Sequence, residues 1–224
     1  MGQKEVQIFI MKKVLITCFE PFGGERVNPS QMAITQLPDE INGVEILKQV
    51  MPTVFGKSID TLYSVLKKEA PDAVICVGQA GGRPSLTVER IAINIDDARI
   101  PDNDGNQPID TPVFVDGPSA YFATLPIKAM VKKCNDIGIP AAISNTAGTF
   151  VCNHLMYAVC HYAALNQPKL KAGFVHIPFV PEQTTDKPTM PSMSCADIIT
   201  GLKSFIKTTI LVDQDVKITG GAEH

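Results

Sequence analysis

No stretch of this 224-residue chain is apolar over the roughly 18 residues that a membrane-spanning helix needs, so we expect no transmembrane segment. The segment 6–19 is apolar in two pieces, but Lys12 and Lys13 divide it and no small-residue cleavage site follows, so it does not predict a signal peptide. The chain also has no basic run long enough to cover a face, and its net charge is −3. These absences argue against nucleic acid and anionic membranes as partners.

The six cysteines include no CxxC pair and no regular framework of spacings, which argues against a disulfide scaffold. Without a secretory signal, free thiols in a reducing cytoplasm are the better interpretation. The four histidines form no HExxH or similar pattern, so their spacing predicts no metal site. We therefore expect a cytoplasmic protein with free thiols.

The length of the chain and its 45% hydrophobic composition suit one globular domain with a substantial core. Because Met11 directly precedes the first strand pattern, we interpret residues 1–10 as a dispensable extension and residues 11–224 as the single domain. Strand patterns alternate with amphipathic helix patterns, which predicts an α/β sheet with helices on both faces. The expected strands are 14–17, 44–50, 73–77, 86–94, 141–144 and 172–177, and the expected helices are 28–37, 59–68, 127–134, 152–163 and 198–206.

Cys152 follows a predicted strand and a loop of small residues, and the apolar residues after it recur at three- and four-residue steps. We therefore expect Cys152 in the first turn of a helix. Unpaired backbone N–H groups and the helix dipole favour negative charge there, so a thiol ionises more easily and an attacked carbonyl oxygen can be held. A small buried thiol at a helix start is an equally good interpretation of this stretch alone.

The other cysteines are weaker candidates for a nucleophile, because they lie within a strand, on apolar helix faces or at element ends without a nearby base: Cys18, Cys76, Cys134, Cys160 and Cys195.

A thiol nucleophile needs a histidine to accept its proton and a third group to orient that histidine. His176 ends a predicted strand and would share an edge of the sheet with Cys152 if this strand were parallel to the one ending at Ser144. A histidine that is hydrogen-bonded within the sheet is the alternative. His154 is two residues after Cys152 and points about 200° away from it around the helix, which makes it a poor base.

Glu89 lies in an otherwise apolar extended segment, where the pattern alone favours a surface ion pair over a partner for a buried group. The stretch 78–83 matches neither a dinucleotide fingerprint nor a Walker motif, although it could form an anion nest. The stretch 102–105 starts like a calcium loop but no glutamate closes it, so we expect a turn within a long loop over 96–118.

Taken together, these motifs resemble the pyroglutamyl-peptidase I (pyrrolidone-carboxylate peptidase) family over nearly the whole chain from about Met11 onward. The resemblance rests on several long motifs in the family's order, namely residues 19–24 with 28–30, 78–83, 89–94, 97–103, 144–153 and 173–178.

The resemblance implies a Cys-His-Glu triad, with Cys152 as nucleophile, His176 as base and then acid, and Glu89 orienting the imidazole. It implies a single-domain open α/β/α sandwich with a mostly parallel mixed sheet, related to purine nucleoside phosphorylases. The implied activity is that of a thiol exopeptidase (an omega-peptidase) that hydrolyses N-terminal pyroglutamate from peptides. Family members form homodimers or homotetramers and use no metal or other cofactor.

A pyroglutamyl site should be apolar, with a few amide partners for the flat lactam ring. Phe19 and Phe22 are expected to sandwich the ring, and the family motifs add three further lining residues and an arginine on the oxyanion side. Core packing is the alternative for each aromatic side chain. The added residues are Gln79, Phe150, Val151 and Arg99.

This chain departs from the family at Cys18, where the family usually has glycine, and the second thiol could alter the pocket loop. Two other functions remain open. One is a nucleoside phosphorylase-type enzyme that uses the stretch 78–83 to hold phosphate, and the other is a non-catalytic lactam-binding protein.

Overall fold

The computed structural model describes residues 13–221, so the expected extension, residues 1–10, lies outside the described residues. The strands are β1 (Lys13–Phe19), β2 (Glu40–Ile41), β3 (Val44–Met51), β4 (Ala73–Gln79), β5 (Leu86–Glu89), β6 (Ile91–Ile93), β7 (Ala120–Phe122), β8 (Ala141–Ser144) and β9 (Lys171–Ile177). The helices are α1 (Pro29–Ile34), α2 (Lys57–Glu69), α3 (Ile127–Asp136), α4 (Val151–Asn166) and α5 (Cys195–Leu211), with a short 3-10 helix, η1 (Pro181–Gln183).

The helices that hydrophobic periodicity predicts are all present, although their ends differ by a few residues. α1 begins as expected, because the Asn28 side chain accepts a hydrogen bond from the Ser30 N–H and Pro29 occupies the first helical position. It ends at Ile34, a few residues earlier than predicted. α5 begins earlier than predicted, because the Ser194 side chain caps it.

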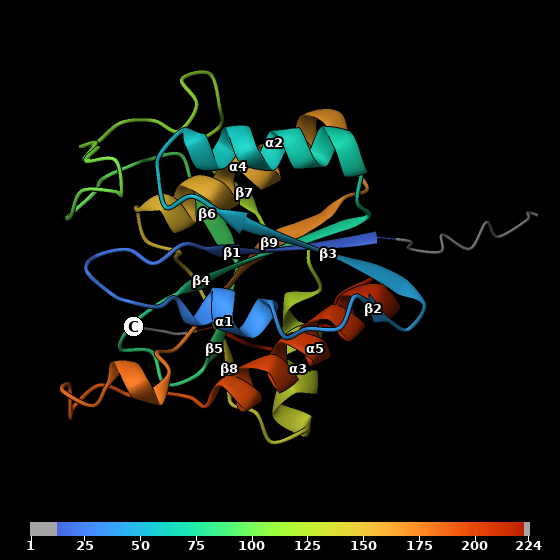
Figure 1. Ribbon diagram of the computed structural model, residues 1–224. Coiled ribbons are helices and arrows are strands. Elements are labelled where there is room, and N and C mark those ends of the chain that lie inside the picture. Colours follow the sequence, from blue (N-terminus) through green and yellow to red (C-terminus); the bar gives the residue numbers. More distant parts are fainter. Residues whose placement is uncertain (1–12, 222–224) are drawn as a thin grey trace, which may run out of the picture.

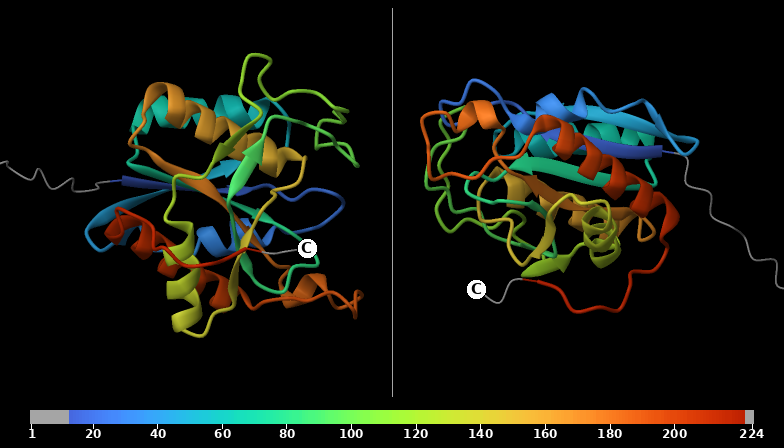
Figure 2. Two further views of the ribbon diagram at one scale, coloured as in Figure 1. Left: turned by 180° about the vertical axis from the view of Figure 1, so that it is seen from behind. Right: turned by 90° about the horizontal axis from the view of Figure 1, so that it is seen from below.

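Seven of the described strands form the main sheet, in the order β2-β3-β1-β4-β9-β5-β8. The pairs β1–β3, β1–β4, β4–β9 and β5–β8 are parallel, whereas β2–β3 and β5–β9 are antiparallel. α2 and α4 cover one face of the sheet, and α1, α3 and α5 cover the other (Figures 1 and 2). This confirms the predicted α/β/α sandwich around a mostly parallel mixed sheet.

Alternate residues of the central strands enter two separate hydrophobic cores. On β4, Val74 and Cys76 pack on the side of α2 and α4, whereas Ile75 packs on the side of α1, α3 and α5. On β9, Phe174 faces the α4 side, so His176, two residues later, faces the same way. The strand period thus places the histidine under α4.

The expected extended segment 86–94 is divided at Arg90. Residues before the break pair within the main sheet, and those after it form a separate two-stranded sheet, β6–β7, against α4. The sequence pattern predicts neither β2 nor β7, because strands of two or three residues are too short to show alternation.

One sequence-based expectation is corrected by the sheet. The sequence pattern places Cys152 and His176 at one edge of the sheet if the strand ending at Ser144 is parallel to the strand of His176. In the structure β8 is parallel to β5, and β5 is antiparallel to β9. β8 therefore runs against β9. The connection 80–85 determines this direction. It leads from the end of β4 past β9, so β5 pairs with the far side of β9 and runs antiparallel to it. The loop 145–150 then returns the chain to the carboxyl end of β9, where α4 begins.

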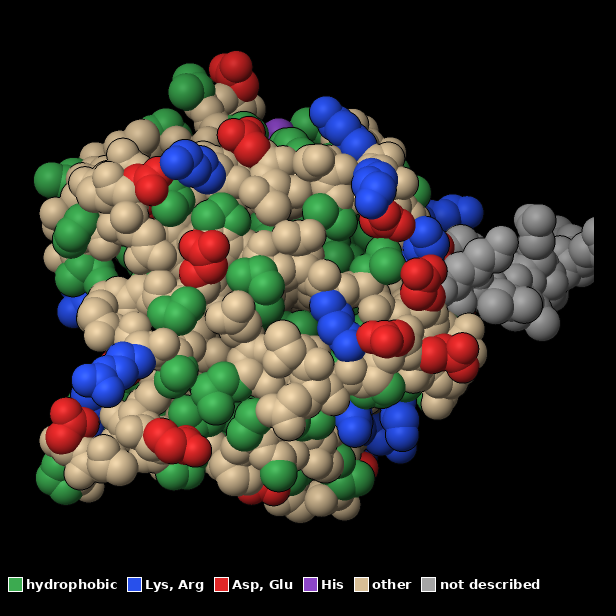
Figure 3. All heavy atoms as spheres, viewed as in Figure 1, with side chains coloured by type: hydrophobic (Ala, Val, Ile, Leu, Met, Phe, Trp, Pro, Cys, Tyr) green, Lys and Arg blue, Asp and Glu red, His purple; other side chains and the backbone are tan. Residues whose placement is uncertain are grey.

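The visible surface agrees with the small net charge. Acidic and basic side chains are mixed over the face shown in Figure 3. No helix within residues 13–221 combines the length and apolar character required to cross a membrane.

Candidate active site

The candidate site lies at the carboxyl end of β9, on the side of the sheet that α4 covers. His176 is the register partner of Gly78 on β4 and of Thr87 on β5. Because paired residues of neighbouring strands point to the same face, the side chains of Thr87 and of Glu89, two residues later, lie on the face of His176. The strand register therefore brings three separate segments together.

His176 and Glu89 form a buried pair, although 87 residues of sequence separate them. The imidazole Nδ1–H donates to Glu89 Oε1 over 2.7 Å, and the side chains of His176 and Glu89 are 5% and 0% exposed. No hydrogen bond joins the imidazole Nε2 to any residue in the range 13–221, so its lone pair is available to accept a proton. The structure thus joins these two predicted residues in one buried, hydrogen-bonded pair.

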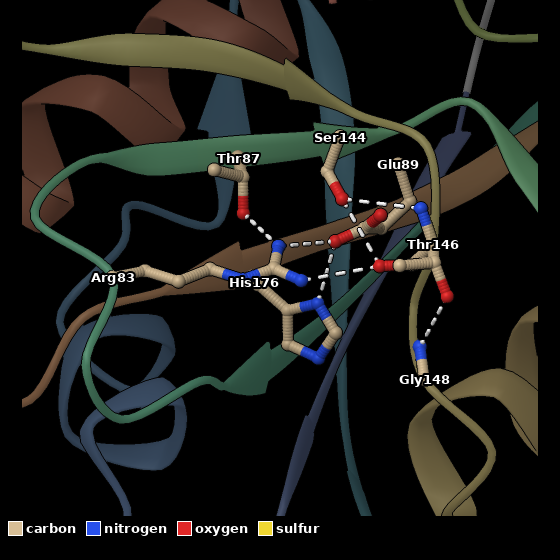
Figure 4. A network of polar contacts seen from close by, with 7 residues as sticks. All are labelled: Arg83, Thr87, Glu89, Ser144, Thr146, Gly148 and His176. Carbon is tan, nitrogen blue, oxygen red and sulfur yellow. Dashed lines mark hydrogen bonds and ion pairs between the residues drawn. The ribbon is translucent and has the colours of Figure 1, made fainter. Parts of the chain in front are cut away.

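The Glu89 carboxylate has a second partner that the sequence interpretation missed. Arg83 Nη1 donates to the same oxygen, Oε1, over 2.6 Å and to Thr87 Oγ1 over 2.5 Å (Figure 4). Arg83 Nη2 donates to the carbonyl oxygen of Thr146 over 3.1 Å. The arginine of the stretch 78–83 is therefore bound to the site itself and does not face an anion nest.

The environment determines the charge of the pair. Burial lowers the pKa of His176 below its ordinary value, and Arg83 acts in the same direction, whereas Glu89 opposes both. Burial alone would raise the pKa of Glu89, but the hydrogen bond from His176 and the charges of His176 and Arg83 hold it below its ordinary value. At neutral pH the site therefore contains a carboxylate and a neutral imidazole.

Cys152 lies in the first turn of α4, as the sequence predicts. Its half-buried thiol lies against Gly78, where a Cβ atom would be 3.0 Å from Cys152 Sγ and 2.8 Å from the ring of Phe174. Any larger residue at position 78 would push against the thiol or the aromatic ring. Because Gly78 pairs with His176, the thiol lies next to the strand position that carries the imidazole.

The helix start predicts a lowered pKa for the Cys152 thiol, but without substrate this pKa is raised. Burial, and secondly the Glu89 carboxylate, raise the pKa of the Cys152 thiol to about 12, against the opposing charge of Arg83. The resting site therefore holds a neutral thiol and a neutral imidazole. The thiol must lose its proton during attack on a substrate, which requires a base close by.

The start of α4 is firmly held but uncapped. No side chain accepts a hydrogen bond from its first N–H groups. The Asn153 side chain instead binds the backbone of Ile93 and Ile95, and His154 Nδ1 binds Asp96 Oδ2 over 2.7 Å. Backbone N–H groups around Cys152 are thus left without a side-chain cap and can serve a negatively charged oxygen.

His154 does not face the thiol. Its Nε2 accepts a hydrogen bond from the Gly56 N–H over 3.0 Å, so both ring nitrogens have partners. This agrees with the expectation that His154 is a poor base.

The structure divides the predicted aromatic pair. Phe19 is 2% exposed and packs against Phe174, with ring centroids 6.3 Å apart, so it is part of the core. Phe22 is only partly buried and packs against Phe150, with centroids 6.0 Å apart. Val151 is fully buried. Phe22 and Phe150 are therefore the two predicted aromatic residues that present accessible surface together.

Gln79, at the end of β4, belongs to a chain of amide hydrogen bonds. Gln183 Nε2 donates to Gln79 Oε1 over 2.9 Å and to Glu25 Oε2 over 3.1 Å, while Gln183 Oε1 accepts from the Val180 N–H. Because the oxygen of Gln79 is already bound, its amide NH₂ group remains as the donor. Gln183 carries no sequence signal for this role, because it lies in a proline-rich loop.

Arg99 is exposed on the long loop, and no hydrogen bond or ion pair joins its side chain to the described part of the chain. The loop itself is tied to the segment before α4, because the Asp97 N–H donates to the Thr149 carbonyl and the Thr149 hydroxyl donates to the Asp97 carbonyl. Asp102, in the predicted turn, accepts hydrogen bonds from the backbone N–H groups of Phe55 and Asn106.

The six cysteines are all free thiols in the structure, as expected. Cys18 is buried at the end of β1, and burial raises its pKa to about 12. Its thiol donates weakly to the Gln49 carbonyl. It therefore packs within the core rather than into the aromatic pair of the site.

No group of three or more histidine, cysteine, aspartate or glutamate side chains between residues 13 and 221 is arranged to hold a metal ion.

Comparisons with known proteins identify the family of the chain. The family model described as "Pyroglutamyl peptidase" matches residues 12–211. A protein of Alkaliphilus oremlandii named pyrrolidone-carboxylate peptidase is 58% identical over 210 residues, which cover 94% of this chain and 99% of that protein. The crystal structure of pyroglutamyl peptidase I from Bacillus amyloliquefaciens superposes with a TM-score of 0.91 at 48% identity, covering 93% of this chain and all of that one. Pyrrolidone carboxyl peptidase from Pyrococcus furiosus has a TM-score of 0.85 at 43% identity, covering 88% of this chain and 98% of that one.

Proposed function

Because the chain belongs to the pyroglutamyl peptidase family, we propose that it is a cysteine exopeptidase, an omega-peptidase, that removes N-terminal pyroglutamate from peptides. Its catalytic triad is Cys152, His176 and Glu89. The observation that carries the assignment is the buried His176–Glu89 pair, together with the Cys152 thiol that lies against Gly78, the register partner of His176.

In the first step the sulfur of Cys152 attacks the carbonyl carbon that joins pyroglutamate to the next residue, and His176 Nε2 takes up the thiol proton. The carbonyl oxygen becomes negative and is held by backbone N–H groups at the uncapped start of α4. His176 then gives its proton to the departing amine as the carbon–nitrogen bond breaks. A thioester between pyroglutamate and Cys152 remains.

In the second step His176 removes a proton from water, and the resulting oxygen nucleophile attacks the thioester. The carbon–sulfur bond breaks, the sulfur regains a proton from His176, and free pyroglutamate leaves. Glu89 keeps Nδ1 protonated and Nε2 available throughout. Arg99, whose side chain is exposed on the long loop, is assigned to the oxyanion side of this site from the family resemblance.

The pyroglutamyl ring is flat and uncharged, so its pocket needs apolar walls and a few amide partners. Phe22 and Phe150 supply accessible aromatic surface, and the NH₂ group of Gln79 can donate to the lactam carbonyl. The buried side chains of Phe19 and Val151 support the pocket from behind.

The enzyme acts without a metal or other cofactor, in the cytoplasm, as a homodimer or homotetramer. Exposed apolar side chains support self-association. Val115 is 85% and Leu165 67% exposed, and both line a groove of about 370 Å³ beside Tyr121 and His161. Large exposed apolar surface is typical of interfaces between proteins. Light scattering at several protein concentrations measures the assembly directly.

The function is tested by the release of amine from a chromogenic pyroglutamyl amide. We expect turnover that iodoacetamide stops and that Cys152→Ala abolishes, while circular dichroism shows a folded protein. The matched control is Cys195→Ala, because Cys195 is the other half-buried thiol and lies at the start of α5. This variant should keep both turnover and sensitivity to iodoacetamide. Hydrolysis that persists unchanged in Cys152→Ala would exclude the mechanism.

A further inference from the structure

Two side chains donate to the Oε1 atom of Glu89, and only one of them belongs to the triad. His176 Nδ1 and Arg83 Nη1 both reach Oε1, over 2.7 and 2.6 Å (Figure 4). A carboxylate that is 0% exposed is strongly destabilised unless a positive charge or several hydrogen bonds compensate it. The neutral imidazole supplies a hydrogen bond but no charge. Arg83 is therefore the charged partner of Glu89.

The planar guanidinium suits this position better than an ammonium group would. Its Nη1 reaches Glu89 and Thr87, whose side chains project from the same face of β5, and its Nη2 reaches the Thr146 carbonyl in the loop that leads to Cys152. A lysine has three N–H donors, but they share one nitrogen and lack the rigid planar fork that reaches acceptors on separate segments. Arg83 thus connects the turn after β4, the strand of Glu89 and the loop before α4.

We propose that Arg83 is a positioning residue of the catalytic site, which aims the Glu89 carboxylate at His176 and supplies the positive charge that this buried carboxylate requires. The inference rests on the proposed triad, because Arg83 acts on the reaction through Glu89.

Arg83 also opposes the effect of the Glu89 charge on the pKa values of Cys152 and His176. Glu89 raises the pKa of the Cys152 thiol and Arg83 lowers it. At His176, Glu89 raises the pKa and Arg83 lowers it. A carboxylate without this arginine would hold the imidazole in its protonated form to higher pH and would make the thiol harder to ionise. The harder ionisation of the thiol opposes the first step of catalysis, and the raised pKa of the imidazole opposes it at pH values low enough to protonate the ring.

The test compares Arg83→Met and Arg83→Lys with the unmodified enzyme, each checked for folding by circular dichroism. For Arg83→Met we expect kcat to fall by about 10- to 100-fold, as for a misplaced catalytic group, with KM nearly unchanged. The acid limb of the pH profile of kcat/KM should move to higher pH, because the pKa of His176 rises without the arginine charge. Arg83→Lys keeps the charge, so its acid limb should stay near that of the unmodified enzyme while kcat falls.

The matched control is Arg90→Met. Arg90 is the neighbour of Glu89 in sequence, but its guanidinium donates to the Gly220 carbonyl and not to the carboxylate, so kcat and the acid limb should not change. In the double variant Glu89→Gln/Arg83→Met, activity should fall no more than about twofold below that of Glu89→Gln, because the arginine acts through the carboxylate.

A folded Arg83→Met with unchanged kcat and an unmoved acid limb would overturn the proposal, as would a fully additive double variant. If Arg83→Met does not fold, an Arg83→Lys enzyme with unchanged kcat overturns it instead. These outcomes, which concern Arg83 alone, can be told apart from failure of the proposed function. If the proposed function is wrong, the unmodified enzyme will not hydrolyse a pyroglutamyl amide, or Cys152→Ala and Glu89→Gln will leave hydrolysis intact.

Discussion

The molecule contains two buried histidine–carboxylate pairs of nearly the same geometry, only one of which is suited to catalysis. His176 binds Glu89 and His154 binds Asp96, in each case through Nδ1 over 2.7 Å. In each pair the side chains are at most 6% exposed. Distance and burial therefore do not distinguish a catalytic pair from a structural one.

The second ring nitrogen makes the difference. In His154 the Nε2 accepts a hydrogen bond from the Gly56 N–H, so the ring joins α4 to the loop before α2. In His176 the corresponding nitrogen has no partner among residues 13–221, and His176 pairs in register with Gly78, against which the thiol of Cys152 lies. A histidine can act as a base only if its free nitrogen faces a proton donor.

The two carboxylates differ as well. Glu89 shares its Oε1 between the histidine and Arg83. In both carboxylates the second oxygen, Glu89 Oε2 or Asp96 Oδ1, is buried without a hydrogen-bond partner in the described part of the chain. What separates them is the arginine at Glu89 Oε1, so the proposed catalytic pair is supported by a third, charged group.

The largest effect should come from the base itself. We expect His176→Ala to lower kcat/KM by at least about 10³-fold, because neither the thiol nor the leaving amine then has a proton partner. The comparison variant His154→Ala should keep kcat/KM within about tenfold of the unmodified enzyme, since it removes no proton carrier. Initial rates with a pyroglutamyl amide measure both. Equal losses in the two variants would mean that the pairs do not differ in function.

Removal of the carboxylate charge should have an intermediate effect. Glu89→Gln keeps the size of the side chain but cannot hold the imidazole as a carboxylate does, so kcat should fall by about 10- to 1,000-fold. The loss should be smaller than that of His176→Ala, because Glu89 exchanges no proton with the substrate. The comparison is made at a single pH with saturating substrate. The reverse order would contradict the assigned roles.

Loss of the His154–Asp96 pair should lower the stability of the protein rather than its catalytic rate. His154→Gln leaves the Gly56 N–H and the Asp96 carboxylate poorly satisfied, so the free energy of unfolding should fall by about 1–3 kcal/mol. Thermal unfolding followed by circular dichroism should show a midpoint several degrees lower. A variant with unchanged stability and strongly reduced kcat would place His154 in the catalytic machinery after all.

The smallest and most selective effect concerns pH. Protonated His176 cannot accept the thiol proton, so activity is lost as pH falls through its pKa. Because burial lowers that pKa, the acid limb of kcat/KM should lie below the ordinary histidine value of about 6.5. The limb should remain in place in His154→Gln. An acid limb above pH ~7 would show that Glu89 dominates burial at His176.

Local sequence was sufficient for the longer elements and for the place of the candidate nucleophile at a helix start. The Asn28 cap, the strand pattern before Gly78 and the helix that begins at Cys152 each depend on residues a few positions apart. Hydrophobic period and capping chemistry act over the same short range, so their signals survive in the sequence. The role of Glu89 came only from family resemblance, because its pattern alone favoured a surface charge.

The directions of the strands, in contrast, could not be predicted from local sequence. The Cys152 thiol does lie against Gly78, the register partner of His176, but the parallel arrangement that would place both residues at one edge is absent, because β8 runs against β9. The loop 145–150 makes the connection instead. The direction of a strand depends on how the connection 80–85 crosses the sheet, and the residues of β8 and β9 carry no signal for that crossing.

By itself, then, the sequence determined the alternation of strands and helices, the thiol at a helix start and the histidine at a strand end. The tertiary structure decided which of two histidines keeps a free nitrogen, which carboxylate is buried and which arginine compensates it. The contacts of Arg83 with Thr146 and of His176 with Glu89 join residues 63 and 87 positions apart. Such partners are selected by strand register and packing, which act across the whole sheet, whereas propensity and periodicity act only along a few neighbouring residues.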